Sequence, residues 1–415
     1  MTSLAPEDLA RAPAGPLWRT PGLGVLFTAS TTARLANESA RVAVVLLVLD
    51  RTRSPALAGA LVAALTLPSL VTGPLLGAWL DRTAHRRSAF VANQVLMPLV
   101  LVGLLLAAGH SPAWVVVALG ALAGVTSPVL TGGFTGLIGP LVPPALLRQA
   151  YGAESTSYNV AGVAGPALAG VLAASFSAET AVVAAAVLSA FALLAVLRVP
   201  MPRPSEVAQE GLLRSVWTGL RHLARTPALR SVTVATTLSF AGMGAFPVLF
   251  PALAKELGAK EAASGALFSA FALGALLGSV ATAARSPRTG PLRLALLGIG
   301  GLGLVFVALI AVDSLPLVLV LVLVGCAFEG PVLSSTLTVR EQSSPATMRT
   351  QVVMTAASLK FAGYALGSAV AGRVIASSGA TGGLVLVTLC QAAGLVVGAT
   401  ALGWPTLRRR FFASA

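Results

Sequence analysis

Long apolar stretches without a charged side chain dominate the pattern of this sequence. The longest cover residues 88–147, 155–178, 231–254, 262–284 and 374–407. A helix needs about 20 apolar residues to cross the hydrocarbon core of a bilayer, so each stretch is long enough. Strands of an outer-membrane barrel would instead alternate in segments of about ten residues. The pattern predicts an all-α polytopic membrane protein and excludes a barrel.

Charges and turn residues divide the chain into twelve predicted spans. Their ranges are 20–49, 55–80, 88–108, 113–141, 152–175, 179–197, 231–254, 262–284, 292–311, 315–339, 351–376 and 381–402. Because twelve is even, we expect both termini on the same side of the membrane. Glu7 and Asp8 stand where a cleaved signal peptide would be apolar, so we expect no such peptide before the first span.

Composition agrees with this pattern: 56% of the residues are hydrophobic and 10% are charged, whereas a soluble domain carries about 25% charged residues. The formal charge of +14 does not indicate a nucleic-acid partner, because the basic residues lie at the ends of apolar stretches. Cys326 and Cys390 both lie inside apolar segments, and the three histidines are scattered. We therefore expect no disulfide framework, no metal site and no cofactor.

The distribution of arginine and lysine predicts the orientation. One set of alternate loops and both termini hold 20 of the 28 basic residues, whereas the opposite loops hold 4. Cytoplasmic loops retain positive charge, so both termini are expected in the cytoplasm of a bacterial inner membrane.

The longest hydrophilic segment, residues 198–230, separates six spans from six. It predicts an N-terminal half over residues 1–197, a cytoplasmic linker, and a C-terminal half over residues 231–415. Within the linker, apolar and basic residues recur on neighbouring faces of one helical pattern. The apolar positions are Leu213, Val216, Trp217, Leu220 and Leu223, and the basic ones are Arg214, Arg221 and Arg225. We expect an amphipathic helix at the cytoplasmic leaflet.

An internal repeat supports two homologous halves. Residues 73–77 match residues 274–278 at an offset of 201. Two further matches follow in order: residues 126–131 with 329–334, offset by 203, and residues 165–170 with 367–372, offset by 202. Each match is weak alone, but three at nearly one offset indicate a duplicated six-helix unit.

The second span runs into Gly-Ala-Trp-Leu-Asp-Arg-Thr-Ala-His-Arg-Arg at residues 77–87. This segment resembles the cytoplasmic signature of the major facilitator superfamily, a glycine, then Asp-Arg, then a basic cluster. Ala84 departs from the usual glycine, and Thr282 replaces the aspartate in the second copy. The resemblance extends over the whole chain and implies two six-helix pseudo-symmetric halves that transport a solute by alternating access.

The same resemblance implies a cytoplasmic gate made of Gly77, Asp81, Arg82, Arg86 and Arg87. Asp81 is expected to accept hydrogen bonds from the N-terminus of a neighbouring helix. The arginines are expected to pair with carboxylates or lipid phosphates. The alternative is that these arginines only fix the topology.

The fifth span carries Gly-Val-Ala-Gly-Pro-Ala-Leu-Ala-Gly at residues 162–170. It resembles a Gly-Pro motif of proton-driven antiporters in this superfamily and therefore favours export. Gly162, Gly165 and Gly170 would allow a neighbouring helix to approach closely, and Pro166 would bend the helix. Generic close packing is the alternative.

Four polar residues share one face of the first span. Arg34, Asn37, Glu38 and Arg41 lie at about 0, 300, 40 and 340 degrees around a helix of 3.6 residues per turn. Each unpaired charge at the centre of a bilayer costs about 2.5 to 3.5 kcal/mol, so the charges must pair or line water. Glu38 can bridge Arg34 and Arg41 as a structural cluster, or it can bind a proton in competition with substrate.

Two more acids extend the candidate coupling site. Glu329 lies deep in the tenth predicted span and Lys360 near the middle of the eleventh, so the two are expected either to form a specialised site or to pair silently. Glu154 lies near the cytoplasmic end of the fifth. The fourth span lacks the arginine that proton-linked drug exporters of the superfamily carry, and Arg34 or Arg41 is the expected substitute.

Together with the resemblance to this superfamily and its antiporter motif, these residues predict a proton-coupled exporter of a small amphiphilic molecule. Substrate contacts are expected at Phe240, Phe246, Phe361 and Tyr364. Phosphate-loop and hydrolase motifs are absent from the sequence, which argues against ATP drive and against an enzyme. A nutrient importer or facilitator is the alternative, and a non-transporting scaffold or sensor is a third hypothesis. The expected partners are the substrate, protons and the bilayer; neither the substrate nor the oligomeric state can be deduced.

Overall fold

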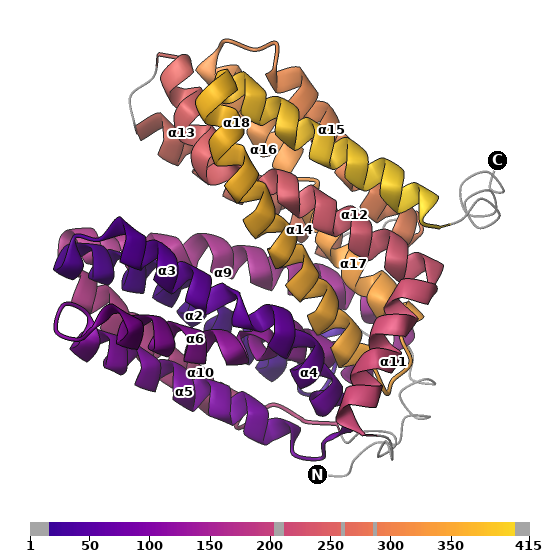
Figure 1. Cartoon of the computed structure of the whole chain (residues 1–415). Helices are drawn as coiled ribbons and strands as arrows, with labels where there is room; N and C mark the ends of the chain where they lie inside the picture. The colour runs from indigo at the N-terminus through magenta and orange to yellow at the C-terminus, as the bar shows by residue number, and fades with distance from the viewer. Residues whose placement is uncertain (1–15, 203–210, 259–261, 285–288, 403–415) are drawn as a thin grey trace, which may run out of the picture. The chain divides into compact units, whose positions relative to one another are not determined.

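The computed structural model describes residues 16–202, 211–258, 262–284 and 289–402, in which every regular element is a helix. Contacts divide the chain into two compact units (Figure 1). Unit 1 comprises Met1–Ala150, Ser157–Gly219 and Pro345–Ala357, and unit 2 comprises Tyr151–Thr156, Leu220–Ser344 and Ser358–Ala415. The units divide the predicted linker after Gly219, and Tyr151–Thr156 and Pro345–Ala357 are each grouped with the unit that contains the other end of the chain. The exact halves stay a prediction.

Unit 1 is built from the helices of the first half of the chain. They are η1 (Leu17–Arg19), α2 (Leu23–Thr52), α3 (Pro55–Thr66), α4 (Pro68–Arg82), α5 (Arg86–Ala107), α6 (Ala113–Pro128), the π-helical η2 (Val129–Gly133), α7 (Phe134–Gly136), α8 (Ile138–Leu141), η3 (Pro144–Leu146), α9 (Leu147–Ser175) and α10 (Ala178–Val196). Helix α10 packs on α2 and α5, and α3 packs on α6. Gly124 of α6 allows this last contact, because an added Cβ atom would lie 2.5 Å from the Ala64 carbonyl oxygen.

Unit 2 follows α11 (Leu212–Arg225), which joins the two units. Its helices are α12 (Pro227–Met243), α13 (Phe246–Glu256), α14 (Ala262–Ala284), α15 (Pro291–Leu309), α16 (Leu315–Cys326), α17 (Glu329–Ser343) and α18 (Arg349–Thr400), of which the part up to Ala357 belongs to unit 1. Helix α14 packs on α16 and α17, and α15 packs on α17. Helix α18 is broken at Gly379, whose φ of 65° few other residues tolerate. Glu256 accepts a hydrogen bond from the next amide, Ala380 N, at 2.6 Å.

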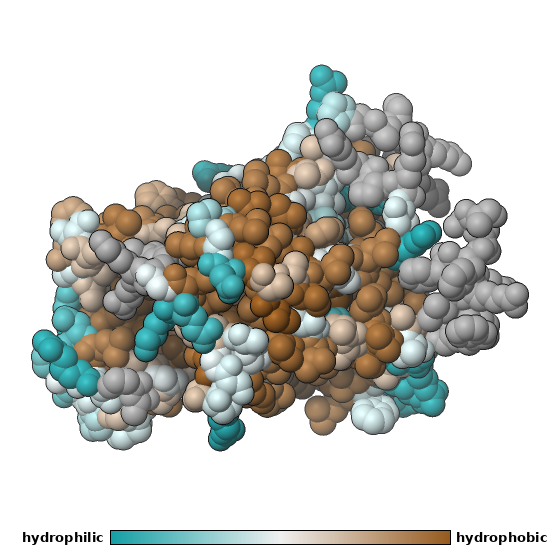
Figure 2. Space-filling view, turned by 90° about the horizontal axis from the view of Figure 1, so that it is seen from above, coloured by the Kyte–Doolittle hydropathy of each residue, from teal (hydrophilic) through white to brown (hydrophobic). Residues whose placement is uncertain are grey.

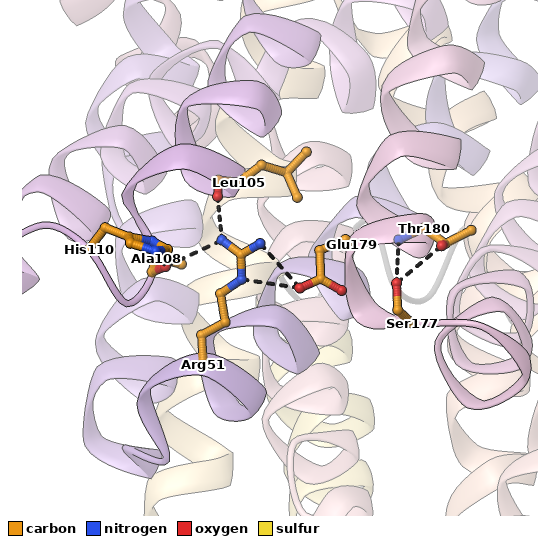
Figure 3. A network of polar contacts seen from close by, with 7 residues as sticks. All are labelled: Arg51, Leu105, Ala108, His110, Ser177, Glu179 and Thr180. Carbon is orange, nitrogen blue, oxygen red and sulfur yellow. Dashed lines mark hydrogen bonds and ion pairs between the residues drawn. The ribbon is translucent and has the colours of Figure 1, made fainter.

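Local sequence explains where several helices begin. Ser54 caps α3 by accepting a hydrogen bond from Leu57 N at 3.2 Å, and Ser177 caps α10 through Thr180 N at 3.2 Å. At the same end of unit 1, Arg51 joins α2 to the ends of α5 and α10 (Figure 3). It forms an ion pair with Glu179 at 3.1 Å and donates hydrogen bonds to the carbonyl oxygens of Leu105 and Ala108.

The described surface is largely hydrophobic. Hydrophobic residues cover the broad middle of the face seen in Figure 2, and hydrophilic residues gather toward its margins. Leu106, Leu304 and Leu366 are among the exposed apolar side chains. A water-soluble protein of this size would not expose so many large apolar side chains together, so this surface is suited to lipid.

Within the described residues, nine helices are long and apolar enough to cross a membrane, or ten if the bent pair α12 and α13 is counted as one span. Helix α2 is 30 residues long but lies outside this count, and α18 is counted once although Gly379 divides it. The all-helical membrane fold is confirmed, whereas the number twelve stays a prediction. The predicted orientation also counts basic residues that lie outside the described residues. These are the basic residues of both chain ends and of linker residues 203–210, together with Lys260, Arg285 and Arg288.

Candidate functional site

Arg34 is buried in unit 1 and held by α9 and η2. Its Nη1 donates a hydrogen bond to Ser157 Oγ at 3.0 Å, and its Nε donates to the Leu130 carbonyl oxygen at 3.3 Å. The guanidinium carbon lies 3.8 Å from the centre of the Tyr158 ring. Tyr158 is itself fixed, because its hydroxyl donates to the Thr131 carbonyl oxygen. The fixed charge is therefore met by a hydroxyl, a carbonyl and an aromatic face.

The other three polar residues of this face lie along α2. Glu38 Oε1 lies 4.0 Å from Arg41 Nη1 and accepts a hydrogen bond from Asn37 Nδ2 at 3.5 Å. Asn37 is buried, whereas Glu38 and Arg41 are about one-third exposed. The expected pair of Glu38 with Arg41 is present, but Arg34 turns to α9 instead of completing a bridge. Sequence spacing could not give this result, because the partners of Arg34 lie on other helices.

Glu329 and Lys360 belong to unit 2. Glu329 begins α17 and is 7% exposed, and its buried Oε1 has no hydrogen-bond partner among the described residues. Lys360 Nζ lies 4.0 Å from the centre of the Phe240 ring and 5.5 Å from that of Phe361. The charges of Glu329 and Lys360 interact, but no contact within the 4.0 Å of an ion pair joins them in the described chain. The cation is instead stabilised by aromatic faces.

The four aromatic candidates occupy different surroundings. Phe240 and Phe361 are half-buried beside Lys360, and Tyr364 is half-buried on the same helix. Phe246 is 3% exposed and stacks between Phe250 and Phe306 at ring-centre distances of 4.8 and 5.3 Å. This position argues against Phe246 as a substrate contact, because its ring is enclosed in the apolar core.

Glu154 is buried in α9, within the segment assigned to unit 2. Its neighbours on this segment bond to other helices of the unit: Tyr151 donates to Glu341 Oε2 at 2.8 Å, and the hydroxyls of Ser155 and Ser279 lie 2.9 Å apart. Our sequence analysis missed Glu341, because it lies beyond the predicted end of the tenth span at residue 339. The helix continues to Ser343, so the carboxylate is buried.

Asp81 connects the signature segment to the first turn of α18. This turn belongs to unit 1, as Asp81 does. Its Oδ1 accepts a hydrogen bond from Thr350 N at 3.0 Å and its Oδ2 from Gln351 N at 2.8 Å. These amides have no acceptor within their own helix, so the carboxylate caps α18 from a distant part of the chain. Gly77 makes room for this contact, since an added Cβ atom would lie 2.5 Å from Gln351 Cα.

The three arginines of the segment bond to neutral oxygens in the contacts described. Arg86 Nε donates to the Leu80 carbonyl oxygen at 2.8 Å, and Arg87 Nη2 donates to that of Val199 at 3.0 Å. Arg82 Nη1 donates to Ser215 Oγ of α11 at 3.1 Å. These contacts fix the loop after α4 and its attachment to α11, and the expected carboxylate or phosphate partners stay a prediction.

The Gly-Pro motif of α9 contacts α2 at one of its glycines. A Cβ atom on Gly165 would lie 2.7 Å from Glu38 Cβ and 2.9 Å from Ser39 N. Ser39 Oγ also donates to the Gly165 carbonyl oxygen at 3.0 Å, one residue before Pro166. Gly162 and Gly170 have no neighbouring atom of the described chain within 4 Å of an added Cβ atom. The close approach that the motif predicts is therefore made by Gly165 alone of the three glycines.

The sequence matches a family model described as Major Facilitator Superfamily over residues 26–368, and again over residues 232–410. The chain belongs to this superfamily. It is a membrane transporter and not an enzyme, and its bacterial relatives support a multi-pass protein of the inner membrane.

Two relatives of this superfamily cover most of the chain. An uncharacterized MFS-type transporter, y4rN, of Sinorhizobium fredii is 30% identical over 372 residues, covering 87% of this chain and 90% of the relative. The multidrug efflux pump Tap of Mycolicibacterium fortuitum is 26% identical over 408 residues, covering 95% of this chain and 98% of the pump.

Solved structures of other transporters share the fold. The human organic anion transporter MFSD10 (TETRAN) has a TM-score of 0.77 at 18% identity, covering 93% of this chain and 100% of that one. The transporter FucP in its outward conformation has a TM-score of 0.74 at 13% identity, covering 93% of this chain and 99% of that one. At these identities the likeness concerns the fold alone.

Proposed function

We propose that this transporter exports a small amphiphilic molecule in exchange for protons. The observation that carries the proposal is Glu329, a carboxylate inside a membrane helix with one buried oxygen that no described group satisfies. A buried charge of this kind is costly unless it is paired or neutralised. Proton binding and release at Glu329, opposed by the Lys360 ammonium, would change the charge of the site once per cycle.

Glu38 supplies the second proton-binding group of the proposal. It is about one-third exposed and its contacts with Arg41 and Asn37 are long, so both a proton and a substrate can reach it. Arg41 keeps positive charge beside Glu38, and Arg34 lies one turn earlier on the same helix, so either would take the role of the arginine that the fourth span lacks. Glu154 is a further buried acid of the same proposal.

The proposed direction is outward because Tap is named an efflux pump and covers nearly the whole chain. Drugs, siderophores and secreted metabolites all remain candidate substrates. The proposed apolar contacts for the substrate are Phe240 and Phe361, half-buried beside Lys360, and Tyr364, half-buried on the same helix as Lys360.

The test is accumulation of dyes and antibiotics in an efflux-deficient bacterial host. We expect the wild type to lower accumulation, and we expect Glu329→Gln, Glu38→Gln or a protonophore to abolish this effect. Asp313→Asn is the matched control, because Asp313 is an exposed acid in the loop between α15 and α16. In everted vesicles, substrate added to the wild type should dissipate a preformed pH gradient.

Three outcomes would contradict the proposal. Efflux that persists in both glutamine variants would show that neither acid carries the proton. Efflux that ignores the protonophore and leaves the pH gradient unchanged would remove proton coupling. Uptake that rises with external substrate and ignores the protonophore would favour the nutrient facilitator.

A further inference from the structure

Helix α11 presents an apolar and basic face that the described chain leaves uncovered. Leu213 is 75% exposed and Trp217 is 67% exposed, one turn apart on the same side of the helix. Arg221 and Arg225 are exposed and lie within about 120° of these side chains on a helical projection. The combination of a tryptophan, a leucine and flanking arginines is typical of helices that lie in a membrane interface.

The opposite side of the first part of α11, up to Gly219, is attached to other helices of unit 1. Gln351 Nε2 donates a hydrogen bond to the Val216 carbonyl oxygen at 2.9 Å, and Arg82 holds Ser215 of the preceding turn at 3.1 Å. Gly219 leaves the space that the Gln351 side chain occupies. Figure 1 shows α11 beside the end of α4, in agreement with the contact of Arg82.

One residue therefore joins α11 to the Asp81 contact. The backbone N of Gln351 donates to Asp81 Oδ2 at 2.8 Å, while its side chain donates to α11. A displacement of α11 would therefore also displace Gln351, the residue whose backbone amide donates to Asp81. An ion or lipid that holds α11 in place also holds this first turn of α18.

The position of α11 along the chain places its end at a membrane surface. Arg225 ends α11, and α12, the first helix of the next predicted span, begins two residues later at Pro227. The arginine distribution predicts that this end lies at the cytoplasmic leaflet, whose anionic lipids give it a negative surface potential. A guanidinium binds a phosphate through two parallel hydrogen bonds, and a tryptophan ring is stable at headgroup depth.

We propose that the exposed face of α11 binds anionic phospholipid headgroups, and that this binding stabilises the contact between Asp81 and the first turn of α18. Charge complementarity selects an anionic headgroup, while the exposed Leu213 and Trp217 select a lipid over a free phosphate. The transporter would then respond to the lipid composition of its own membrane, independently of which substrate it carries.

Hydrogen–deuterium exchange tests the proposal without a substrate. Full-length protein is placed in nanodiscs of phosphatidylcholine alone or with phosphatidylglycerol, and exchange is measured for a peptide containing the amides of Thr350 and Gln351. We expect exchange to be about fivefold slower with the anionic lipid, the effect of one arginine–lipid contact. The Arg221→Gln/Arg225→Gln variant should lose this difference, whereas Arg198→Gln, an exposed arginine outside α11, should retain it.

A second measurement separates lipid binding from its transmission. Brominated phosphatidylglycerol should quench Trp217, measured as the difference between the wild type and Trp217→Phe, more than brominated phosphatidylcholine does. Gln351→Met keeps the backbone amide that bonds to Asp81 but removes the donor to Val216. It should retain quenching by the anionic lipid and lose the lipid dependence of exchange.

Two results would overturn the proposal. Equal quenching of Trp217 by the two lipids, or none, would mean that α11 does not recognise an anionic leaflet and that its face serves another partner. Quenching without any change in exchange at residues 350–351 of the wild type would mean that lipid binding does not reach the Asp81 contact. Free inorganic phosphate in phosphatidylcholine nanodiscs should have no effect, and a full effect would replace the lipid with the free ion.

Discussion

Arg34 illustrates how a single buried charge is stabilised inside a membrane protein. Its planar guanidinium donates in two directions, to a hydroxyl and a carbonyl, and at the same time stacks on the Tyr158 ring. Lysine has a compact ammonium that cannot satisfy these three partners from one position. The site is therefore specific for arginine and not merely for positive charge.

A comparison of Arg34→Lys with Arg41→Lys tests this interpretation. We expect Arg34→Lys to lower the free energy of unfolding by about 1 to 3 kcal/mol, because buried hydrogen-bond acceptors lose their donor. Arg41→Lys should change it by less than about 1 kcal/mol, because Arg41 is partly exposed and its ion pair is long. Thermal unfolding in detergent, followed by intrinsic fluorescence, measures both. Equal effects would show that only the charge matters at residue 34.

At this scale the sequence predicts which residues share a helix face but not what they contact. Periodicity correctly indicated that Arg34, Asn37, Glu38 and Arg41 share one side of a helix, and the pair of Glu38 with Arg41 follows from their spacing. Ser157 and Tyr158 could not be inferred, because contacts between helices more than 100 residues apart leave no local pattern. Glu341 was missed because α17 extends beyond the apolar stretch from which the helix was predicted.

The elements show the same balance, since helix positions were predictable and helix packing was not. The predicted ranges 113–141 and 262–284 coincide with the observed helical segments, and most other boundaries differ by a few residues. Helices α9 and α17 are longer than predicted, because a helix continues past the apolar core of the membrane into charged residues such as Arg148 and Arg340. The two parts of α18 were predicted as separate spans, and Gly379 lies between their predicted ranges.

Helix packing at Gly165 gives a prediction with an internal control. Gly165→Ala should lower the free energy of unfolding by about 1 to 3 kcal/mol, because the new methyl group overlaps Glu38 and Ser39 of α2. Gly162→Ala should be neutral or stabilising by up to about 1 kcal/mol, since alanine favours helix and nothing lies near the added carbon. Thermal unfolding of both variants in the same detergent measures the two changes in stability. A Gly165→Ala variant as stable as Gly162→Ala would contradict the close approach of α9 to α2.

For the whole molecule, the internal repeat predicted a duplicated architecture, but the two copies have diverged at the signature segment. Asp81 accepts two amide hydrogen bonds, whereas Thr282, at the equivalent position, donates to the Gly278 carbonyl oxygen of its own helix. Unit 2 instead contains the bond of Tyr151 with Glu341 and the contact of Ser155 with Ser279. The carboxylate in the second copy therefore sits on α17, where the repeat gave no reason to look for it.

The orientation and the number of spans can be tested together by labelling single cysteines. In a background of Cys326→Ala and Cys390→Ser, an impermeant maleimide applied to intact cells should label Ser111→Cys, between α5 and α6. It should label Ala84→Cys, between α4 and α5, only after permeabilisation. Both positions are exposed loop residues, so accessibility within the protein is matched.

Ser377→Cys decides whether α18 crosses the membrane once or twice. It is exposed and lies two residues before the break at Gly379, so with two crossings it should be labelled from outside, like Ser111→Cys. Both parts of α18 exceed the roughly 20 residues that a crossing needs, and Glu256 caps the second part at its first amide. If α18 turns back in this way, the chain end after Thr400 returns to the arginine-rich side. Labelling of Ser377→Cys only after permeabilisation would contradict both the second crossing and the count of twelve.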